Sequence, residues 1–70
     1  MNIEDIINVL KKNDYKITPQ RKAIIQALIE NDTSLISIEA LFARAKQLYS
    51  KTNISTIYRN LEILEKFVLL

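Results

Sequence analysis

The sequence has no glycine and a single proline, Pro19, so clusters of polar residues must mark the breaks in its backbone. Between these clusters, apolar residues recur at the three- and four-residue spacing of helices along the whole chain. The first helix should end at Asn13-Asp14, because these residue types tolerate a left-handed exit where glycine is missing. The pattern predicts an all-α or mainly α fold, a small bundle of four helices.

The second helical segment has the clearest start signal in the chain. Thr18 can cap it, and Pro19 fits the first helical position because its missing N–H would be unpaired there anyway. Apolar residues wrap most of the circumference, namely Ala23, Ile24, Ile25, Ala27, Leu28 and Ile29. This breadth predicts a central helix.

The last two helical segments lie close together in the sequence. Ser37 should cap the third helix, whose apolar stripe includes Leu48 and Tyr49 and leads to a connection at 50–53. Asn53 should cap the last helix, 54–66, in which the apolar residues are 54, 57, 61 and 64. Two helices joined by a short turn, the second with a polar N-terminal half, predict a helix-turn-helix. Residues 35–36 are a candidate short strand.

Composition argues against catalysis and against a metal site within the chain. Histidine and cysteine are both absent, which removes the commonest general base and the commonest metal ligands. No apolar run is long enough for a signal peptide or a membrane span. We therefore expect a non-enzymatic, soluble, cytoplasmic protein with no membrane partner and no cofactor in this chain.

The net charge is only +2, but the basic residues gather in stretches 15–29 and 40–61, which contain no acid. On a helical projection, Arg59 lies opposite the apolar stripe of the last helix, with Tyr58 on its flank. In a recognition helix Arg59 can fork onto O6 and N7 of guanine, and Tyr58 can pack on a thymine methyl. Both residues are therefore candidates for contacts with DNA bases.

Other residues are candidates for contacts outside the major groove. Lys16, in the loop before the second helix, is placed to enter a narrow, A·T-rich minor groove. Phosphate contacts are assigned to Arg21, Lys22, Lys51, Ser55 and Thr56.

A simpler interpretation stands beside each of these assignments. Tyr15 and Tyr58 can cover edges of the core, Arg59 can pair with Glu62, and each isolated cation can be merely solvated. The alternative for the whole chain is a helical protein-interaction module that does not bind DNA.

Three stretches, "YKITPQRKAII", "ISIEALF" and "NISTIYRNLEILEKF", resemble the amino-terminal winged-helix domain of the ferric uptake regulator family of metal- or peroxide-responsive repressors. The resemblance covers essentially all the chain, and the pairing of "TPQR" with "STIYRNL" is quite specific. It implies binding of double-stranded DNA, usually an A·T-rich inverted repeat, by a homodimeric bacterial repressor. By position, it implies base contacts for Tyr58 and Arg59, a minor-groove contact for Lys16, and a match of Arg21 to the arginine of "TPQR".

Members of this family typically continue into a two-stranded wing and a dimerisation domain. The resemblance therefore implies that residues 1–70 are the amino-terminal part of a longer regulator, with the wing truncated. The parent protein is expected to bind zinc and a regulatory metal (Fe, Mn, Zn or Ni) in its carboxy-terminal domain. Near position 35, many relatives have a metal-binding histidine, where this chain has Leu35.

The apolar end of the chain, Phe67 to Leu70, is expected either to fold back on the bundle or to mediate self-association. Ile63 is expected to project outward beside Arg59.

Overall fold

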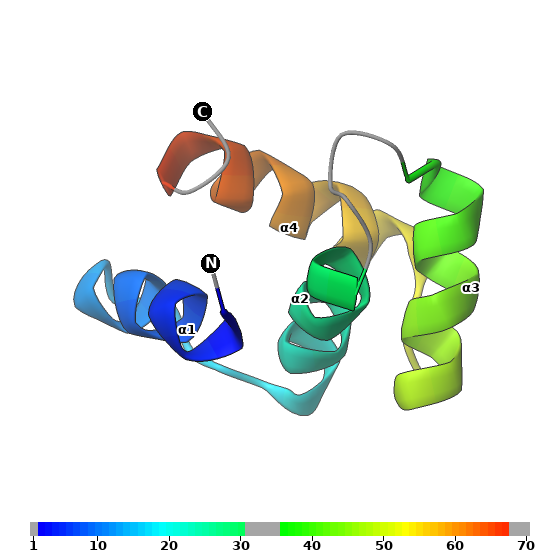
Figure 1. Ribbon diagram of the computed structural model, residues 1–70, viewed down its shortest axis with the longest axis horizontal. Helices are drawn as coiled ribbons and strands as arrows, with labels where there is room; N and C mark the ends of the chain where they lie inside the picture. The colour runs from blue at the N-terminus through cyan, green and yellow to red at the C-terminus, as the bar shows by residue number, and fades with distance from the viewer. Residues whose placement is uncertain (1, 31–35, 68–70) are drawn as a thin grey trace.

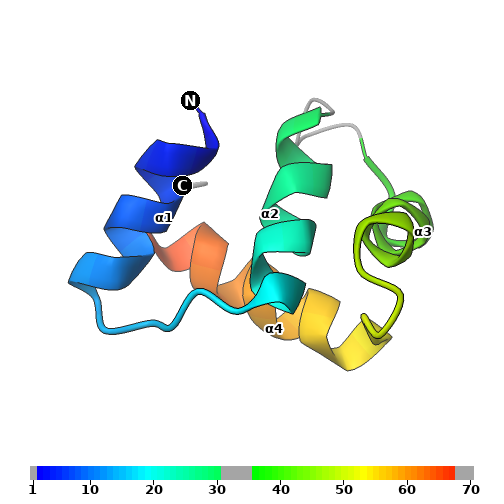
Figure 2. The same cartoon turned by 90° about the horizontal axis from the view of Figure 1, so that it is seen from below.

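A computed structural model describes residues 2–30 and 36–67. These residues form four α-helices, with bounds Ile3–Lys12 (α1), Pro19–Glu30 (α2), Ile38–Leu48 (α3) and Ile54–Phe67 (α4). Figures 1 and 2 show α2 lying between α1 and α3, while α4 packs against α2 and α3. Within the described ranges the all-α prediction is confirmed, and Ile36 is not in a strand; Leu35 lies outside them.

The helix boundaries follow from local chemistry, largely as predicted. At each N-terminus a side-chain oxygen accepts a 3.0–3.1 Å hydrogen bond from the backbone N–H three residues on; the capping residues are Asn2, Thr18, Ser37 and Asn53. At the end of α1 the backbone turns at Asp14, which has a φ of 66°. An aspartate therefore adopts the left-handed conformation for which glycine is more usual.

The core is built around α2, as its broad apolar surface predicted. Within α2, residues 23–25, 27 and 28 are buried. The other helices contribute buried apolar residues to the same cluster: Ile6, Leu10, Leu41, Ala45, Ile57 and Leu64. Among the described residues, no helix is both long enough and apolar enough to span a bilayer.

The C-terminal end of α3 differs from the prediction. The helix ends at Leu48, which is 41% exposed, and Tyr49 is its extended C-cap residue. The connection to α4 therefore comprises 49–53, one residue more than expected. It is fixed by Thr52, which is buried and donates from both its backbone N and its Oγ1 to the Tyr49 carbonyl at 3.0 and 2.7 Å.

The buried side of α4 also differs from the prediction. Ile54, expected in the apolar stripe, is 40% exposed, whereas Asn60 is buried. The buried residues of α4 are Ile57, Asn60 and Leu64, so the side of the helix that faces the core is centred closer to residue 60 than the prediction had it. The same shift brings Ile63 against the core, so the expectation that Ile63 projects outward is wrong.

The end of α4 packs back on the loop that precedes α2. The rings of Phe67 and Tyr15 meet edge to face with centroids 5.8 Å apart, and the Tyr15 N–H donates to the Leu10 carbonyl at 3.0 Å. Tyr15 thus packs on the rim of the core. Of the apolar end, Phe67 folds back on the bundle, while residues 68–70 lie outside the described ranges.

Candidate nucleic-acid interface

The first two turns of α4 present two long polar side chains to solvent. Tyr58 is 54% exposed, and Arg59 is also exposed. Within the described part of the chain neither side chain makes a hydrogen bond or an ion pair, and Arg59 does not pair with Glu62. Both side chains are therefore available for an external partner.

The N-terminus of α4 is organised by one amide oxygen. Asn53 Oδ1 accepts the Thr56 N–H at 3.0 Å, the Thr56 hydroxyl at 3.0 Å and the Ser55 hydroxyl at 2.8 Å. Because each hydroxyl has one proton, neither can donate to a phosphate while it is bonded to Asn53. The phosphate contacts predicted for Ser55 and Thr56 would therefore require these hydroxyls to rotate away from the cap.

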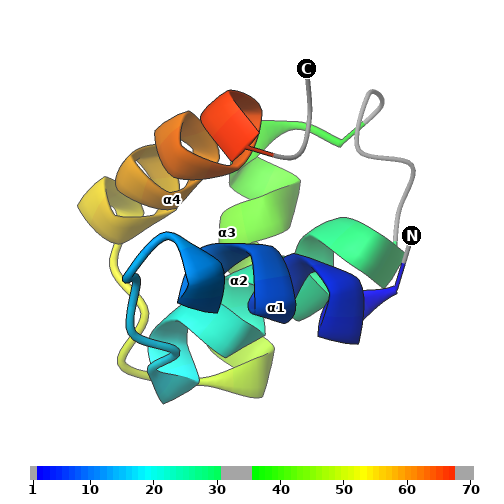
Figure 3. The same ribbon diagram turned by 90° about the vertical axis from the view of Figure 1, so that its left-hand side faces the viewer.

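The loop before α2 lies on the same side of the molecule as the start of α4. Figures 2 and 3 both show this arrangement, along the lower edge of Figure 2 and at the left of Figure 3. Lys16 in this loop and Lys51 in the connection before α4 are both exposed. We use the name basic face for Lys16, Lys51, Tyr58 and Arg59, which are four exposed residues predicted to contact DNA and lie in this loop, in the connection before α4 and at the start of α4.

Arg21 has a more internal position than the prediction of a phosphate contact suggested. Its Nε donates to Asn60 Oδ1 at 2.7 Å, and its Nη1 donates to the Lys16 carbonyl at 2.8 Å. The guanidinium carbon lies 5.4 Å from the centroid of the Tyr15 ring. Arg21 therefore links α2 to both the loop and α4, and its contact with phosphate stays a prediction.

Asn60 is the residue of this region that sequence reasoning missed. It is 2% exposed, accepts from Arg21, and donates from Nδ2 to the Thr56 carbonyl at 2.8 Å. Its spacing, three residues after Ile57 and four before Leu64, was a signal that it shares their side of the helix. The polar side chain concealed this signal, because a buried asparagine is expected only where partners satisfy it.

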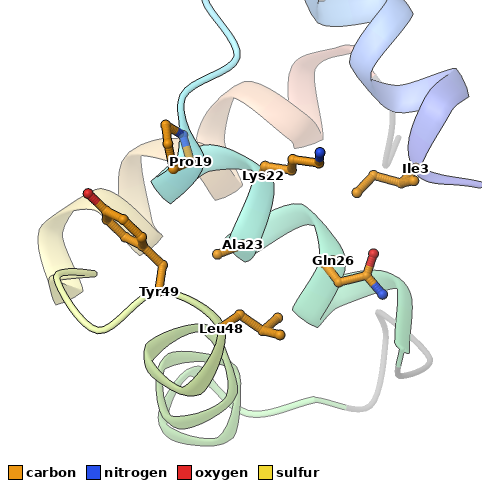
Figure 4. Close-up of a pocket in the computed structure, with 7 residues that line it drawn as sticks. All are labelled: Ile3, Pro19, Lys22, Ala23, Gln26, Leu48 and Tyr49. Carbon is orange, nitrogen blue, oxygen red and sulfur yellow. The ribbon is translucent and has the colours of Figure 1, made fainter.

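Lys22, also predicted to contact phosphate, lies beside α1. It lines a pocket of about 260 Å³ together with Ile3, Pro19, Ala23, Gln26, Leu48 and Tyr49. Figure 4 shows the Lys22 side chain extending toward Ile3 at the start of α1. No carboxylate, histidine or cysteine is among these lining residues, so the pocket offers none of the usual acid–base pairs for catalysis.

Arg44, in the second basic stretch, is engaged by an acid from α2. Its Nε and Nη2 donate to the two carboxylate oxygens of Glu30 at 2.6 and 2.9 Å. The hydrogen bond from Arg44 holds the pKa of Glu30 below its usual value, against a smaller opposing effect of desolvation. Arg44 therefore ties α3 to α2 and is not part of the basic face.

The described residues do not fit a metal site, since no three side chains of His, Cys, Asp or Glu gather among residues 2–30 and 36–67. Position 35, where a metal-binding histidine was noted in relatives, falls outside these ranges.

Comparison with known proteins places the chain in a family. The model of the ferric uptake regulator family matches residues 4–70. The chain is 36% identical over 62 residues to the ferric uptake regulation protein of Bacillus subtilis (strain 168), covering 89% of this chain and 42% of that protein. It is 36% identical over 61 residues to the peroxide-responsive repressor PerR of Staphylococcus saprophyticus, covering 87% of this chain and 40% of that protein.

A third relative is the ferric uptake regulation protein of Staphylococcus aureus (strain Mu50), which is 33% identical over 63 residues, covering 90% of this chain and 46% of that protein. The chain thus spans less than half the length of these curated relatives. No solved structure gave a significant match. The family match spans nearly all of the sequence, and the chain belongs to the ferric uptake regulator family.

Proposed function

We propose that this chain is the operator-reading domain of a metal- or peroxide-responsive transcriptional repressor, and that it binds double-stranded DNA through α4. The observation that carries the proposal is the exposure of Tyr58 and Arg59, without partners in the described chain, on the first two turns of the second helix of a helix-turn-helix. The N-terminal half of such a helix enters the major groove. There Arg59 forks onto a guanine and Tyr58 packs on a thymine methyl.

Lys16 is proposed to reach the minor groove beside the docked helix. It is exposed in the loop that shares a side of the molecule with the start of α4. A·T-rich DNA has a narrow minor groove whose negative potential attracts a lysine. Lys51, in the connection before α4, is proposed to neutralise a backbone phosphate.

The response to a signal is proposed from the relatives' names. They are a ferric uptake regulation protein and a peroxide-responsive repressor, and both are more than twice as long as the matched region. The zinc and regulatory metal, and the homodimer that would read an inverted repeat, are proposed for the longer regulator.

The proposal is tested by measuring DNA affinity at several salt concentrations. Fluorescence anisotropy with an A·T-rich duplex should give a linear log–log plot, with a slope of about −0.9 for each phosphate neutralised. Arg59→Ala should weaken binding by about 1–3 kcal/mol and relax the preference for the base it reads.

Arg44→Ala is the matched control, because it removes the same charge from a residue that is paired with Glu30 and is not part of the basic face. It should leave the base preference unchanged. Salt-independent binding, or an Arg59→Ala variant with unchanged affinity and base preference, would contradict the proposal and favour a protein-interaction module.

A further inference from the structure

We propose that Arg21 is a positioning residue, which holds the Lys16 loop and the recognition helix α4 in one fixed arrangement so that both can engage DNA together. This inference rests on the proposed function and deepens it. In this inference, the hydrogen bond between Arg21 and Asn60 holds the major-groove contact of α4 and the minor-groove contact of Lys16 at a fixed distance from each other.

The bonds of Arg21 join three separate parts of the fold. From α2, Nε reaches Asn60 Oδ1 in α4 at 2.7 Å, and Nη1 reaches the Lys16 backbone carbonyl at 2.8 Å. The loop is held from a second direction by the Tyr15 ring, which contacts both the guanidinium and Phe67 in α4. The Lys16 backbone is therefore fixed relative to α4, while its side chain stays exposed.

The burial of Asn60 makes this link specific. Asn60 is 2% exposed, and its amide is satisfied on both sides, by Arg21 and by the Thr56 carbonyl. A buried amide with both bonds made has one favourable position, since losing either partner would leave a polar group unpaired. Asn60 also follows directly on Tyr58 and Arg59, so the link reaches the helical turn that reads the bases.

A guanidinium suits this role better than an ammonium group. Its planar fork presents N–H donors in fixed directions, and two of its nitrogens here serve acceptors that are far apart in the sequence. A lysine carries the same charge on one flexible nitrogen and lacks this geometry. A loop held in advance also loses less conformational freedom when it binds DNA.

The test compares the salt dependence of DNA binding with and without Lys16, in several backgrounds. In the otherwise unchanged chain, Lys16→Ala should reduce the magnitude of the log–log slope by about 0.9, the effect of one cation. Two variants are designed to weaken the Arg21–Asn60 link without changing the net charge. Arg21→Lys keeps the positive charge, and Asn60→Ser replaces one neutral residue by another at a buried position. Each is expected to give the same reduction in slope, and Lys16→Ala should then have no further effect.

Two results would overturn the positioning role. If Lys16→Ala has its full effect in both backgrounds, the loop does not depend on the link. The second result has three parts: Arg21→Lys and Asn60→Ser both keep the salt slope of the unchanged chain, and Arg21→Gln reduces its magnitude. This result would mean that the charge of Arg21 contacts a phosphate directly. If the unchanged chain shows no salt-dependent DNA binding at all, the proposed function itself fails.

Circular dichroism of each variant shows whether it is folded. If the variants unfold, the inference is tested on the unchanged chain by NMR. The Arg21 Nε–H, which donates to Asn60, should be protected from solvent exchange in both the free and the DNA-bound chain. Loss of that protection on DNA binding would show that Arg21 leaves Asn60, and would overturn the inference.

Discussion

At the residue scale, a few polar side chains fix the backbone where glycine is absent. Asn53 caps α4 with one oxygen that accepts from three donors, two of which are hydroxyls. Asp14 adopts a positive φ after α1. These positions determine where the helices begin and end, and Asn53 also determines whether the hydroxyls beside the basic face are available.

Replacing Asn53 tests the importance of this cap. Asn53→Ala should lower the free energy of unfolding by about 1 kcal/mol, because it leaves the Thr56 N–H without its side-chain acceptor. Urea denaturation followed by circular dichroism measures this loss. Asn53→Ser keeps a capping oxygen and should stay close to the original stability; an equal loss in both variants would show that capping is not the cause.

At the element scale, side-chain bonds between helices set their relative placement. The Arg44–Glu30 pair joins α3 to the end of α2, and Gln26 Nε2 also donates to Glu30 Oε1 at 3.3 Å. The Arg21–Asn60 bond joins α2 to α4. The Arg44–Glu30 pair and the Arg21–Asn60 bond thus lie near opposite ends of the central helix and join it to different helices.

The Glu30 carboxylate should make stability depend on pH. Its pKa is lowered in the folded chain, chiefly by the hydrogen bond from Arg44, so the folded state favours the charged form. The stabilisation is complete above the usual glutamate pKa of about 4.3 and is lost as the pH falls through the lower pKa of the folded state.

The difference in unfolding free energy between the unchanged chain and Glu30→Gln, measured by urea denaturation, should therefore shrink across this acidic range. Glu62→Gln is the control, since Glu62 makes no ion pair among the described residues. A difference that stays constant down to the lowest pH would contradict the role of the pair.

At the scale of the whole molecule, a small core supports the interface. A single core of this size supplies only ~3–5 kcal/mol of net stability without disulfides or metals. The fully buried side chains come from all four helices, and among them Ile24 on the central helix α2 has no exposed surface. The placement of the basic face therefore depends on a core with little reserve.

Truncating Ile24 should unfold much of the population. Ile24→Ala is expected to cost about 2–5 kcal/mol, the range for emptying a buried aliphatic position, which is comparable to the whole net stability. Leu48→Ala is the matched control, because Leu48 is 41% exposed and its loss should stay within about 0.5 kcal/mol. The fraction folded at 25 °C, measured by circular dichroism, distinguishes the two; similar values would contradict this account of the core.

Local features of the sequence were sufficient to predict the four helices and three of their four N-terminal caps. Capping at Thr18, Ser37 and Asn53 was predicted correctly, and of the pair Asn13-Asp14 expected to end the first helix, Asp14 adopts the left-handed conformation. These features depend on residues three or four positions apart, whose relation a helix fixes by itself. The exposure of Arg59 and Tyr58 followed from the same periodicity.

The tertiary structure alone decided what contacts form across the chain. The 39-residue separation between Arg21 and Asn60 hid their bond, which turned a predicted surface cation into an internal link and a polar residue into part of the core. Sequence determined the helices because helical hydrogen bonds and caps are local. Packing decided the roles of Arg21, Arg44 and Asn60, because each needs a partner that only folding brings within hydrogen-bond distance.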